Sequence, residues 1–277
     1  MTVLLALIAA ACYGVGDFAG GLAARGRNTI TILLTSYPVG ALLVLAMLPL
    51  LPGHLGLGTL GWGIGGGLAG LAGVVMMYSA LAIAPMSVVS PVTAVMAAMV
   101  PLIVGVGLGE RPTLPAWTGI VIGLGAVVLI SRTPEDHPHG RIAPRTIAMA
   151  LLGGVGFGLY FVCLARADRG SGIWPVIIAR FTSSLMLVPL AWRLRRFGRV
   201  HGRLLAVTVL AGVGDAGANL FFLLASRHGY LGLAGVLTSL YPAGTVLLAA
   251  IVLRERIGGV QRAGLGLAAA AIVLITR

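Results

Sequence analysis

Hydrophobic residues run along the chain in long blocks, separated by short polar or arginine-bearing connections. A membrane-spanning helix needs about 20 consecutive apolar residues, and blocks of that length follow one another from end to end. The first block lacks a basic leader and a small-residue cleavage site, so we interpret it as a spanning helix rather than a signal peptide. The pattern predicts an all-α integral membrane protein with ten transmembrane helices, at 3–24, 29–51, 59–83, 86–108, 114–131, 146–167, 173–192, 204–226, 230–253 and 258–276.

Composition supports this interpretation and excludes other classes of protein. The 277 residues are 58% hydrophobic and only 9% charged, whereas a soluble domain has about 25% charged residues. Such a chain cannot cover its own core with polar surface, which excludes a soluble enzyme, a disordered protein and a nucleic-acid-binding module. The net charge of +12 comes from arginines that lie, with one exception, at or between the ends of the apolar blocks. The expected partner is therefore the lipid bilayer and not a nucleic acid.

The two halves of the sequence resemble each other. At an offset of 145, Glu110-Arg111 falls on Glu255-Arg256, and eight of the 23 positions from 110 to 132 are identical. At an offset of 144, Tyr13-Gly14 falls on Phe157-Gly158. A repeat of this length indicates duplication of a structural unit.

The repeat predicts the organisation of the chain. We expect a first five-helix repeat at 1–131, a polar linker at 132–145 and a second five-helix repeat at 146–277. Because five is odd, the second repeat would enter the bilayer upside down relative to the first. Two inverted repeats around a midplane site are typical of secondary transporters. The internal dyad is compatible with a functional monomer.

Several short motifs carry a family resemblance. They are the aromatic-Gly pair in the first helix of each half, the Glu-Arg pair after the fourth helix, the Gly-led fifth helix and Arg180-Phe181 in the seventh. With these motifs the whole chain resembles the drug/metabolite transporter superfamily in its ten-helix EamA-type branch. The resemblance implies export of a small organic metabolite by alternating access, with amino acids or related amphipathic compounds as the favoured cargo. One departure is Pro242, which aligns with Ala97, so the fourth and ninth helices are expected to bend differently.

Three charged residues lie well inside predicted spans: Asp17, Arg180 and Asp215. Each costs about 2.5–3.5 kcal/mol at a helix centre, so they need partners or water. We expect Arg180 to pair with one carboxylate and to leave the other for a substrate ammonium or a proton. The alternative is that Arg180 and its partner tie helices together and take no part in transport.

Both aspartates end the tetrapeptide Gly-Val-Gly-Asp, at 14–17 and 212–215. Gly-x-Gly-Asp also occurs in intramembrane aspartyl proteases, where two carboxylates share a proton. That alternative would make Asp17 and Asp215 catalytic. Against it, no Tyr-Asp dipeptide or Pro-Ala-Leu motif accompanies them, and the repeat does not make them symmetry mates. We interpret the glycines as surfaces that let helix backbones approach closely.

Further candidates for substrate binding come from the third, fourth, eighth and ninth helices, which resemble the cavity-lining helices of the superfamily. Hydroxyl and amide groups among Met and aromatic side chains suit a small amphipathic ligand. The alternative for each is an ordinary interhelical hydrogen bond, worth about 0.6 kcal/mol. These candidates are Tyr78, Ser79, Thr93, Met96, Met99, Asn219, Phe222, Thr238, Ser239 and Tyr241.

No cofactor or metal site is expected. The histidines lie in connections or at helix ends, the chain has no H-E-x-x-H motif and no P-loop, and Cys12 and Cys163 sit inside apolar blocks as structural thiols. A membrane scaffold without transport activity is the remaining alternative.

The arginines are distributed unequally between the two sides of the membrane. With the N-terminus on side one, the connections of the other side hold 13 arginines and those of side one hold five. The positive-inside rule then places both termini outside, whereas ten-helix relatives are usually drawn with both termini in the cytoplasm. An arginine-only, Ala- and Gly-rich vocabulary suggests a bacterial cytoplasmic membrane.

We predict that a reporter fused after Arg277 is active on the external side, because the arginine-rich connections anchor the opposite face in the cytoplasm. Periplasmic and cytoplasmic reporters at this one position give the measurement. A cytoplasmic signal would overturn the assignment.

Overall fold

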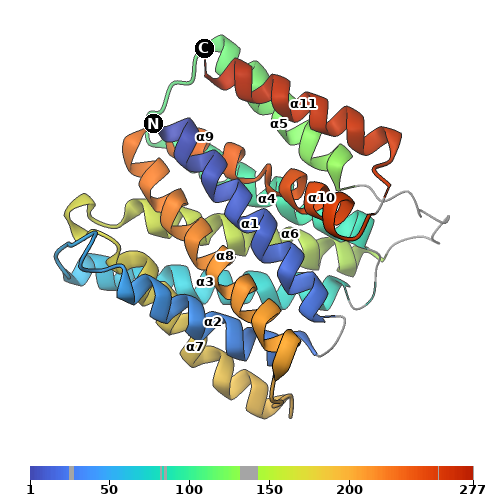
Figure 1. The fold of residues 1–277 in the computed structure, drawn as a ribbon. Coiled ribbons are helices and arrows are strands. Elements are labelled where there is room, and N and C mark those ends of the chain that lie inside the picture. The colour runs from blue at the N-terminus through green and yellow to red at the C-terminus, as the bar shows by residue number, and fades with distance from the viewer. Residues whose placement is uncertain (25–27, 82, 84–85, 132–142, 255, 277) are drawn as a thin grey trace.

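The structure is a computed structural model that describes the chain except for residues 25–27, 82, 84–85, 132–142, 255 and 277, together with the side chains of 78, 81 and 86–88. The described residues form helices and no strands (Figure 1). In chain order these are α1 (Thr2–Ala24), α2 (Thr29–Ala46), α3 (Leu57–Leu81), α4 (Met86–Gly107), α5 (Leu114–Ile130), α6 (Pro144–Arg166), the 3₁₀ turn η1 (Arg169–Ser171), α7 (Trp174–Arg193), α8 (Gly202–His228), α9 (Leu231–Thr238), α10 (Tyr241–Val252) and α11 (Gly259–Ile275).

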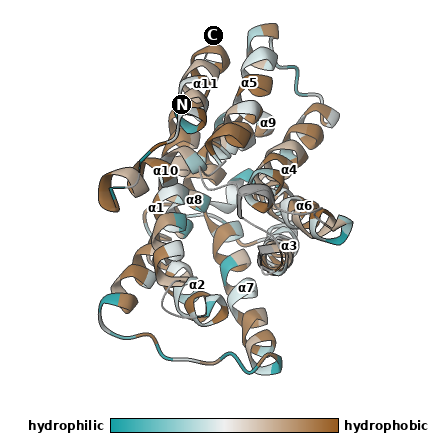
Figure 2. Ribbon diagram, turned by 90° about the vertical axis from the view of Figure 1, so that its right-hand side faces the viewer, coloured by the Kyte–Doolittle hydropathy of each residue, from teal (hydrophilic) through white to brown (hydrophobic). Residues whose placement is uncertain are grey.

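Among the described residues, eight helical stretches are long and apolar enough to cross a membrane, with Leu231–Val252 counted as one. The apolar helices α5 and α11 are shorter, at 17 residues each, which is about 25 Å of helix. Apolar residues dominate the helices, and hydrophilic residues gather at their ends and connections (Figure 2). Large hydrophobic side chains face outward, including Leu185 at 66% and Ile251 at 74% exposure. The protein is thus an all-helical, multi-pass membrane protein.

The ninth span, predicted over 230–253, is present as one apolar stretch, Leu231–Val252, but it consists of two helices rather than one. α9 ends at Thr238, and α10 starts at Tyr241 with Pro242 in its first turn. Proline has no N–H to donate to the carbonyl four residues earlier, and its ring clashes with that carbonyl, which here belongs to Thr238. The fourth span, in contrast, stays one helix through Pro91 and Pro101. The two spans therefore differ as expected, since the helix is interrupted at Ser239–Leu240 in the ninth span and continuous in the fourth.

Several other boundaries differ from those predicted by one to five residues, most of all the end of the second span. α2 ends at Ala46 rather than at residue 51, and the chain continues through turns to Pro52. α6 begins at Pro144, inside the predicted linker, because proline has the φ angle of a helix and needs no donor in the first turn. The rest of that linker, 132–142, lies outside the described residues.

Helices from before and after the linker pack on one another. The closest pairs are α1 with α8, α3 with α6, and α5 with α11, which lie side by side at one edge of the molecule (Figure 1). The contacts are reciprocal between the two halves. The fourth span, α4, packs on α6, and its counterpart, α9 with α10, packs on α1; α4 and α9 also pack on each other. The two segments therefore interlock and do not form separate bundles.

The two Gly-Val-Gly-Asp tetrapeptides meet where α1 crosses α8. A Cβ built on Gly16 would lie 2.9 Å from the backbone nitrogen of Asp215, and one on Gly214 would lie 2.7 Å from the backbone nitrogen of Gly16. Gly212 faces the backbone of Ser36 in α2 in the same way. No side chain fits at these points, so the glycines form the packing surface expected from the sequence.

Gly16→Ala should lower the melting temperature of the purified protein in detergent. The added methyl would meet backbone atoms that cannot move away, and overpacking of this kind costs about 1–3 kcal/mol. Gly21→Ala is the matched control on the same helix, since no heavy atom lies within 4 Å of its Cβ position. Equal melting temperatures for the two variants would contradict the close crossing.

Candidate functional site

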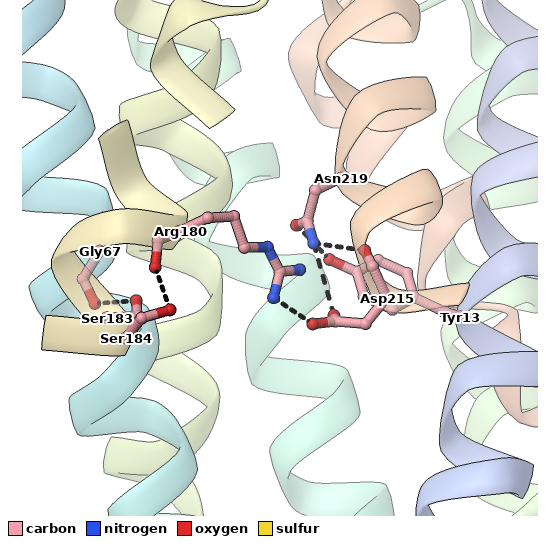
Figure 3. A network of polar contacts seen from close by, with 7 residues as sticks. All are labelled: Tyr13, Gly67, Arg180, Ser183, Ser184, Asp215 and Asn219. Atoms are coloured by element: carbon pink, nitrogen blue, oxygen red, sulfur yellow. Dashed lines mark hydrogen bonds and ion pairs between the residues drawn. The ribbon is translucent and has the colours of Figure 1, made fainter. Parts of the chain in front are cut away.

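An ion pair joins α7 to α8 inside the membrane-spanning region (Figure 3). The guanidinium Nη1 of Arg180 contacts the carboxylate Oδ2 of Asp215, with side-chain exposures of 5% and 31%. The same guanidinium lies over the ring of Tyr37 in α2, with its Cζ 5.3 Å from the ring centroid. Both contacts stabilise the arginine, because the carboxylate balances its charge and the face of an aromatic ring attracts a guanidinium.

Serine side chains fix the helix that carries Arg180. The hydroxyl of Ser183 donates to the carbonyl of Gly67 in α3 at 2.8 Å, and this contact is buried. The hydroxyl of Ser184 donates to the carbonyl of Arg180 itself at 2.8 Å (Figure 3). α7 is thereby held on α3 at the level of the ion pair.

Asn219 extends the network to α1. Its amide donates to the backbone carbonyl of Asp215 at 2.6 Å and faces that residue's Oδ1 at 3.4 Å. Its Oδ1 accepts a hydrogen bond from the hydroxyl of Tyr13 at 2.6 Å (Figure 3). Since Asn219 is 1% exposed, this chain of contacts from α1 through α8 to α7 is shielded for most of its length.

Aromatic rings gather beside this network. The Tyr13 ring lies 5.8 Å from that of Tyr241 and 6.1 Å from that of Phe161, centroid to centroid. Phe161 in turn packs against Phe222 at 4.2 Å. Rings from α1, α6, α8 and α10 therefore form one continuous aromatic wall next to the charges.

Asp17 lies one turn after Tyr13 on α1 and is not covered by neighbouring helices. It is within electrostatic range of Asp215 and Tyr241. Asp17 forms no ion pair with any residue that the structure describes, whereas Asp215 has Arg180. The site therefore combines one neutralised carboxylate with one accessible carboxylate.

Some buried polar atoms near the network have no hydrogen-bond partner among the described residues. They include the Nε of Arg180. The hydroxyl of Tyr160 lies close enough to Arg180 to interact with it electrostatically. The hydroxyl of Thr238, at the end of α9, is also buried and unsatisfied within the described part of the chain. Buried polar groups are normally satisfied, so these atoms are available to water or to a ligand.

The structure sorts the residues that the sequence proposed for binding. Asn219, Phe222 and Tyr241 lie in the network or its aromatic wall, with the three charged residues. The hydroxyls of Ser79, Thr93 and Ser239 instead donate to the backbone carbonyls of Val75, Ala150 and Val236, which is a structural use. Met96 and Met99 are half-buried along α4. The side chain of Tyr78 lies outside the described residues.

Four aromatic residues of the site were not proposed from the sequence: Tyr13, Tyr37, Tyr160 and Phe161. A signal existed for two of them. Tyr13 precedes Asp17 by one helical turn, and Phe161 falls on Asp17 when the halves are aligned at an offset of 144. For Tyr37 and Tyr160 no local pattern separates a site residue from an ordinary aromatic in a span.

The Glu-Arg motif has a structural role in the first half. The carboxylate of Glu110 accepts hydrogen bonds from the backbone N–H groups of Leu231 and Gly232, the latter at 3.0 Å. A carboxylate at this place satisfies free donors of the first turn of α9 and complements its dipole. Glu110 therefore ties the end of the fourth span to the start of the ninth. Its counterpart Glu255 lies outside the described residues.

Comparison with known proteins assigns the family. The model of the EamA-like transporter family matches residues 1–132 and 144–277. The chain belongs to the EamA-like transporter family. Membership confirms the resemblance read from the sequence and makes the protein a membrane transporter of the drug/metabolite type.

Solved structures share the fold of this EamA-like transporter, and 29 of their chains match it. One, described only as "Crystal structure of protein", has a TM-score of 0.82 at 19% identity and covers 99% of this chain and 96% of its own. No curated protein matches the sequence.

The geometry bears on the other candidate chemistries. Asp215 is engaged by Arg180, which differs from the proton-sharing pair of carboxylates that an aspartyl protease needs. Within the described residues, no group of three His, Cys, Asp or Glu side chains could hold a metal ion. The network places charged side chains beside an aromatic surface.

We predict that Arg180→Ala destabilises the protein more than the double variant Arg180→Ala with Asp215→Ala. The single change strands a carboxylate inside the membrane, a loss on the order of 3 kcal/mol, whereas removing both partners leaves no uncompensated charge. Thermal unfolding in detergent measures both, and Arg203→Ala, which removes an exposed arginine, should resemble wild type. A double variant as unstable as the single one would contradict this account.

Proposed function

We propose that the protein is a secondary transporter that exports a small organic metabolite across a bacterial cytoplasmic membrane by alternating access. Amino acids and related amphipathic compounds are the favoured cargo, and both chain termini lie outside. The observation that carries the proposal is the Arg180–Asp215 pair beside the accessible carboxylate of Asp17 and a wall of aromatic rings. Charges inside spans are costly, and they persist where a polar substrate or ion must pass.

The arrangement suits a zwitterion with an apolar side chain. The Nε of Arg180, which has no hydrogen-bond partner among the described residues, is a donor for a substrate carboxylate, and Asp17 is an acceptor for an ammonium group. The rings of Tyr13 and Tyr241 offer apolar surface between these two positions. A substrate carboxylate would compete with Asp215 for the guanidinium, so binding would loosen the contact between α7 and α8.

Alternating access would follow from two inverted five-helix repeats that rock against each other. The reciprocal helix contacts support this. So does one matched pair of close approaches. Gly16 faces Asp215, and at the repeat offsets these positions correspond to Tyr160 and Gly70, where a Cβ on Gly70 would lie 3.0 Å from the Tyr160 ring. The broken ninth span, tied to Glu110, provides a place where one half can bend without unwinding a helix.

Two energy sources fit this site. In proton antiport, Asp17 or Asp215 would bind a proton and the substrate in turn, so that the two move in opposite directions. In facilitated export, the substrate gradient alone would drive the cycle. The remaining alternatives are a scaffold, which would show no flux and no ligand-induced thermal shift, and a protease, which would cleave peptides in detergent.

The test is a flux screen in proteoliposomes over the amino acids, with and without a pH gradient. Uptake or counterflow of a subset, absent from protein-free vesicles, supports transport. Stimulation by the gradient supports antiport. No flux for any compound, in vesicles that contain folded protein, would sink the proposal.

Asp17→Asn and Asp215→Asn should each change the flux or its pH dependence, because each removes a charge that faces the substrate path. We expect Asp215→Asn also to lower stability by leaving Arg180 unpaired. Asp168→Asn is the matched control, since this aspartate lies outside the spans and its side chain caps the η1 turn. Wild-type flux and pH profile for both site variants, at equal expression, would reduce the aspartates to structural roles.

A further inference from the structure

The connection between α7 and α8 carries the largest group of arginines in the chain. Five arginines fall within the 11 residues from 193 to 203, and no acidic residue occurs between Asp168 and Asp215. All five side chains are exposed, and none is ion-paired to a residue that the structure describes. These arginines are Arg193, Arg195, Arg196, Arg199 and Arg203.

A surface hollow of about 470 Å³ lies at the start of this connection. Two of the arginines, Arg193 and Arg195, line it together with the aromatic residues Trp192 and Phe197. Trp192 is 76% exposed and Phe197 is 58% exposed. The hollow therefore presents two guanidinium groups next to two aromatic rings that nothing in the described chain covers.

The backbone around the hollow is fixed. The N–H of Arg196 donates to the carbonyl of Ala191 at 3.0 Å, which closes the end of α7. The carbonyl of Arg196 accepts from the hydroxyl of Thr31 at 3.1 Å, and Val200 is buried against α1 and α2. Arg195 itself has a φ of 51°, a left-handed conformation for which helix ends normally use glycine. Arg195 thus places a long cationic side chain at a position where the backbone conformation favours glycine.

Tryptophans mark the depth of the hollow in the bilayer. Trp174 and Trp192 lie at opposite ends of α7, 18 residues apart, which corresponds to about 27 Å along a helix. That length is close to the thickness of the hydrocarbon core, and tryptophan prefers the two membrane interfaces. The hollow therefore lies at the level of the lipid headgroups.

We infer that this hollow binds the headgroup phosphate of an anionic phospholipid. The fork of a guanidinium matches two phosphate oxygens, and clustered arginines next to a spanning helix attract anionic lipid. The rings of Trp192 and Phe197 lie against the glycerol and the upper acyl chain. This apolar part of the lining favours a lipid over free phosphate. The site is separate from the ion pair of Arg180 and does not depend on what is transported.

The test compares two double variants of the full-length protein. Arg193→Gln with Arg195→Gly removes both guanidinium groups from the hollow, and glycine suits the φ of position 195. The control, Arg199→Gln with Arg203→Gln, removes the same charge from the same connection outside the hollow. Retention of phosphatidylglycerol against phosphatidylcholine is measured by native mass spectrometry, and the melting temperature is measured in the presence of each lipid.

Phosphatidylglycerol should be retained by wild type and control and should raise their melting temperatures, while the Arg193/Arg195 variant binds it roughly tenfold or more weakly. An equal loss in the control would show diffuse charge attraction and overturn the site. Equal effects of phosphatidylcholine, or of inorganic phosphate at the same concentration, would overturn it as well.

A second measurement needs no arginine variant. Brominated phosphatidylglycerol should quench the fluorescence of Trp192 in the wild-type protein, obtained as the difference from Trp192→Phe, more than brominated phosphatidylcholine does. Equal quenching by the two lipids would contradict the proposal. Neither measurement uses transport as its readout, so both outcomes are independent of the proposed function.

Discussion

The contact between Arg180 and Asp215 is the constraint around which the spans are arranged. A lone charge of either sign is costly in the bilayer, so the two must meet, and α7 and α8 must be placed for them to meet. The glycines next to Asp215 allow α1 and α2 to close on α8, and Ser183 secures α7 on α3. Small residues at the helix crossings and the Arg180–Asp215 pair thus fix how α1, α2, α3, α7 and α8 lie relative to one another.

The two halves of the chain share their helix packing but differ in the charged residues of the candidate site. Helices of the two matched segments pack in reciprocal pairs, yet the charged residues have no symmetric partners: the position matching Asp17 is Phe161, and the one matching Asp215 is Gly70. Each half therefore holds one acidic residue, and the other half has phenylalanine or glycine at the matching position.

Arg180 and the group of arginines near Trp192 lie at different depths relative to the membrane. Arg180 is shielded between helices and has a carboxylate and a ring as partners, whereas the arginines near Trp192 lie at a helix end and face outward. The first group links helices within the spans, and the second lies where we propose that it meets lipid headgroups. In each case the position of the arginine relative to the hydrocarbon determines which partners it can reach.

The sequence by itself determined the helical class, most span positions, the need of Arg180 for a carboxylate and the packing use of the Gly-Val-Gly-Asp glycines, because hydropathy, helix length and charge cost are local properties. It did not decide which aspartate pairs with Arg180, that Glu110 caps α9, or that Tyr13 reaches Asn219. The Glu110 and Tyr13 contacts join residues more than a hundred positions apart, which only the tertiary structure brings together. The pairing of Arg180 depends on which helix packs against α7. Pro242 lies between these cases: its effect is local, but only the packed structure shows the ninth span divided in two.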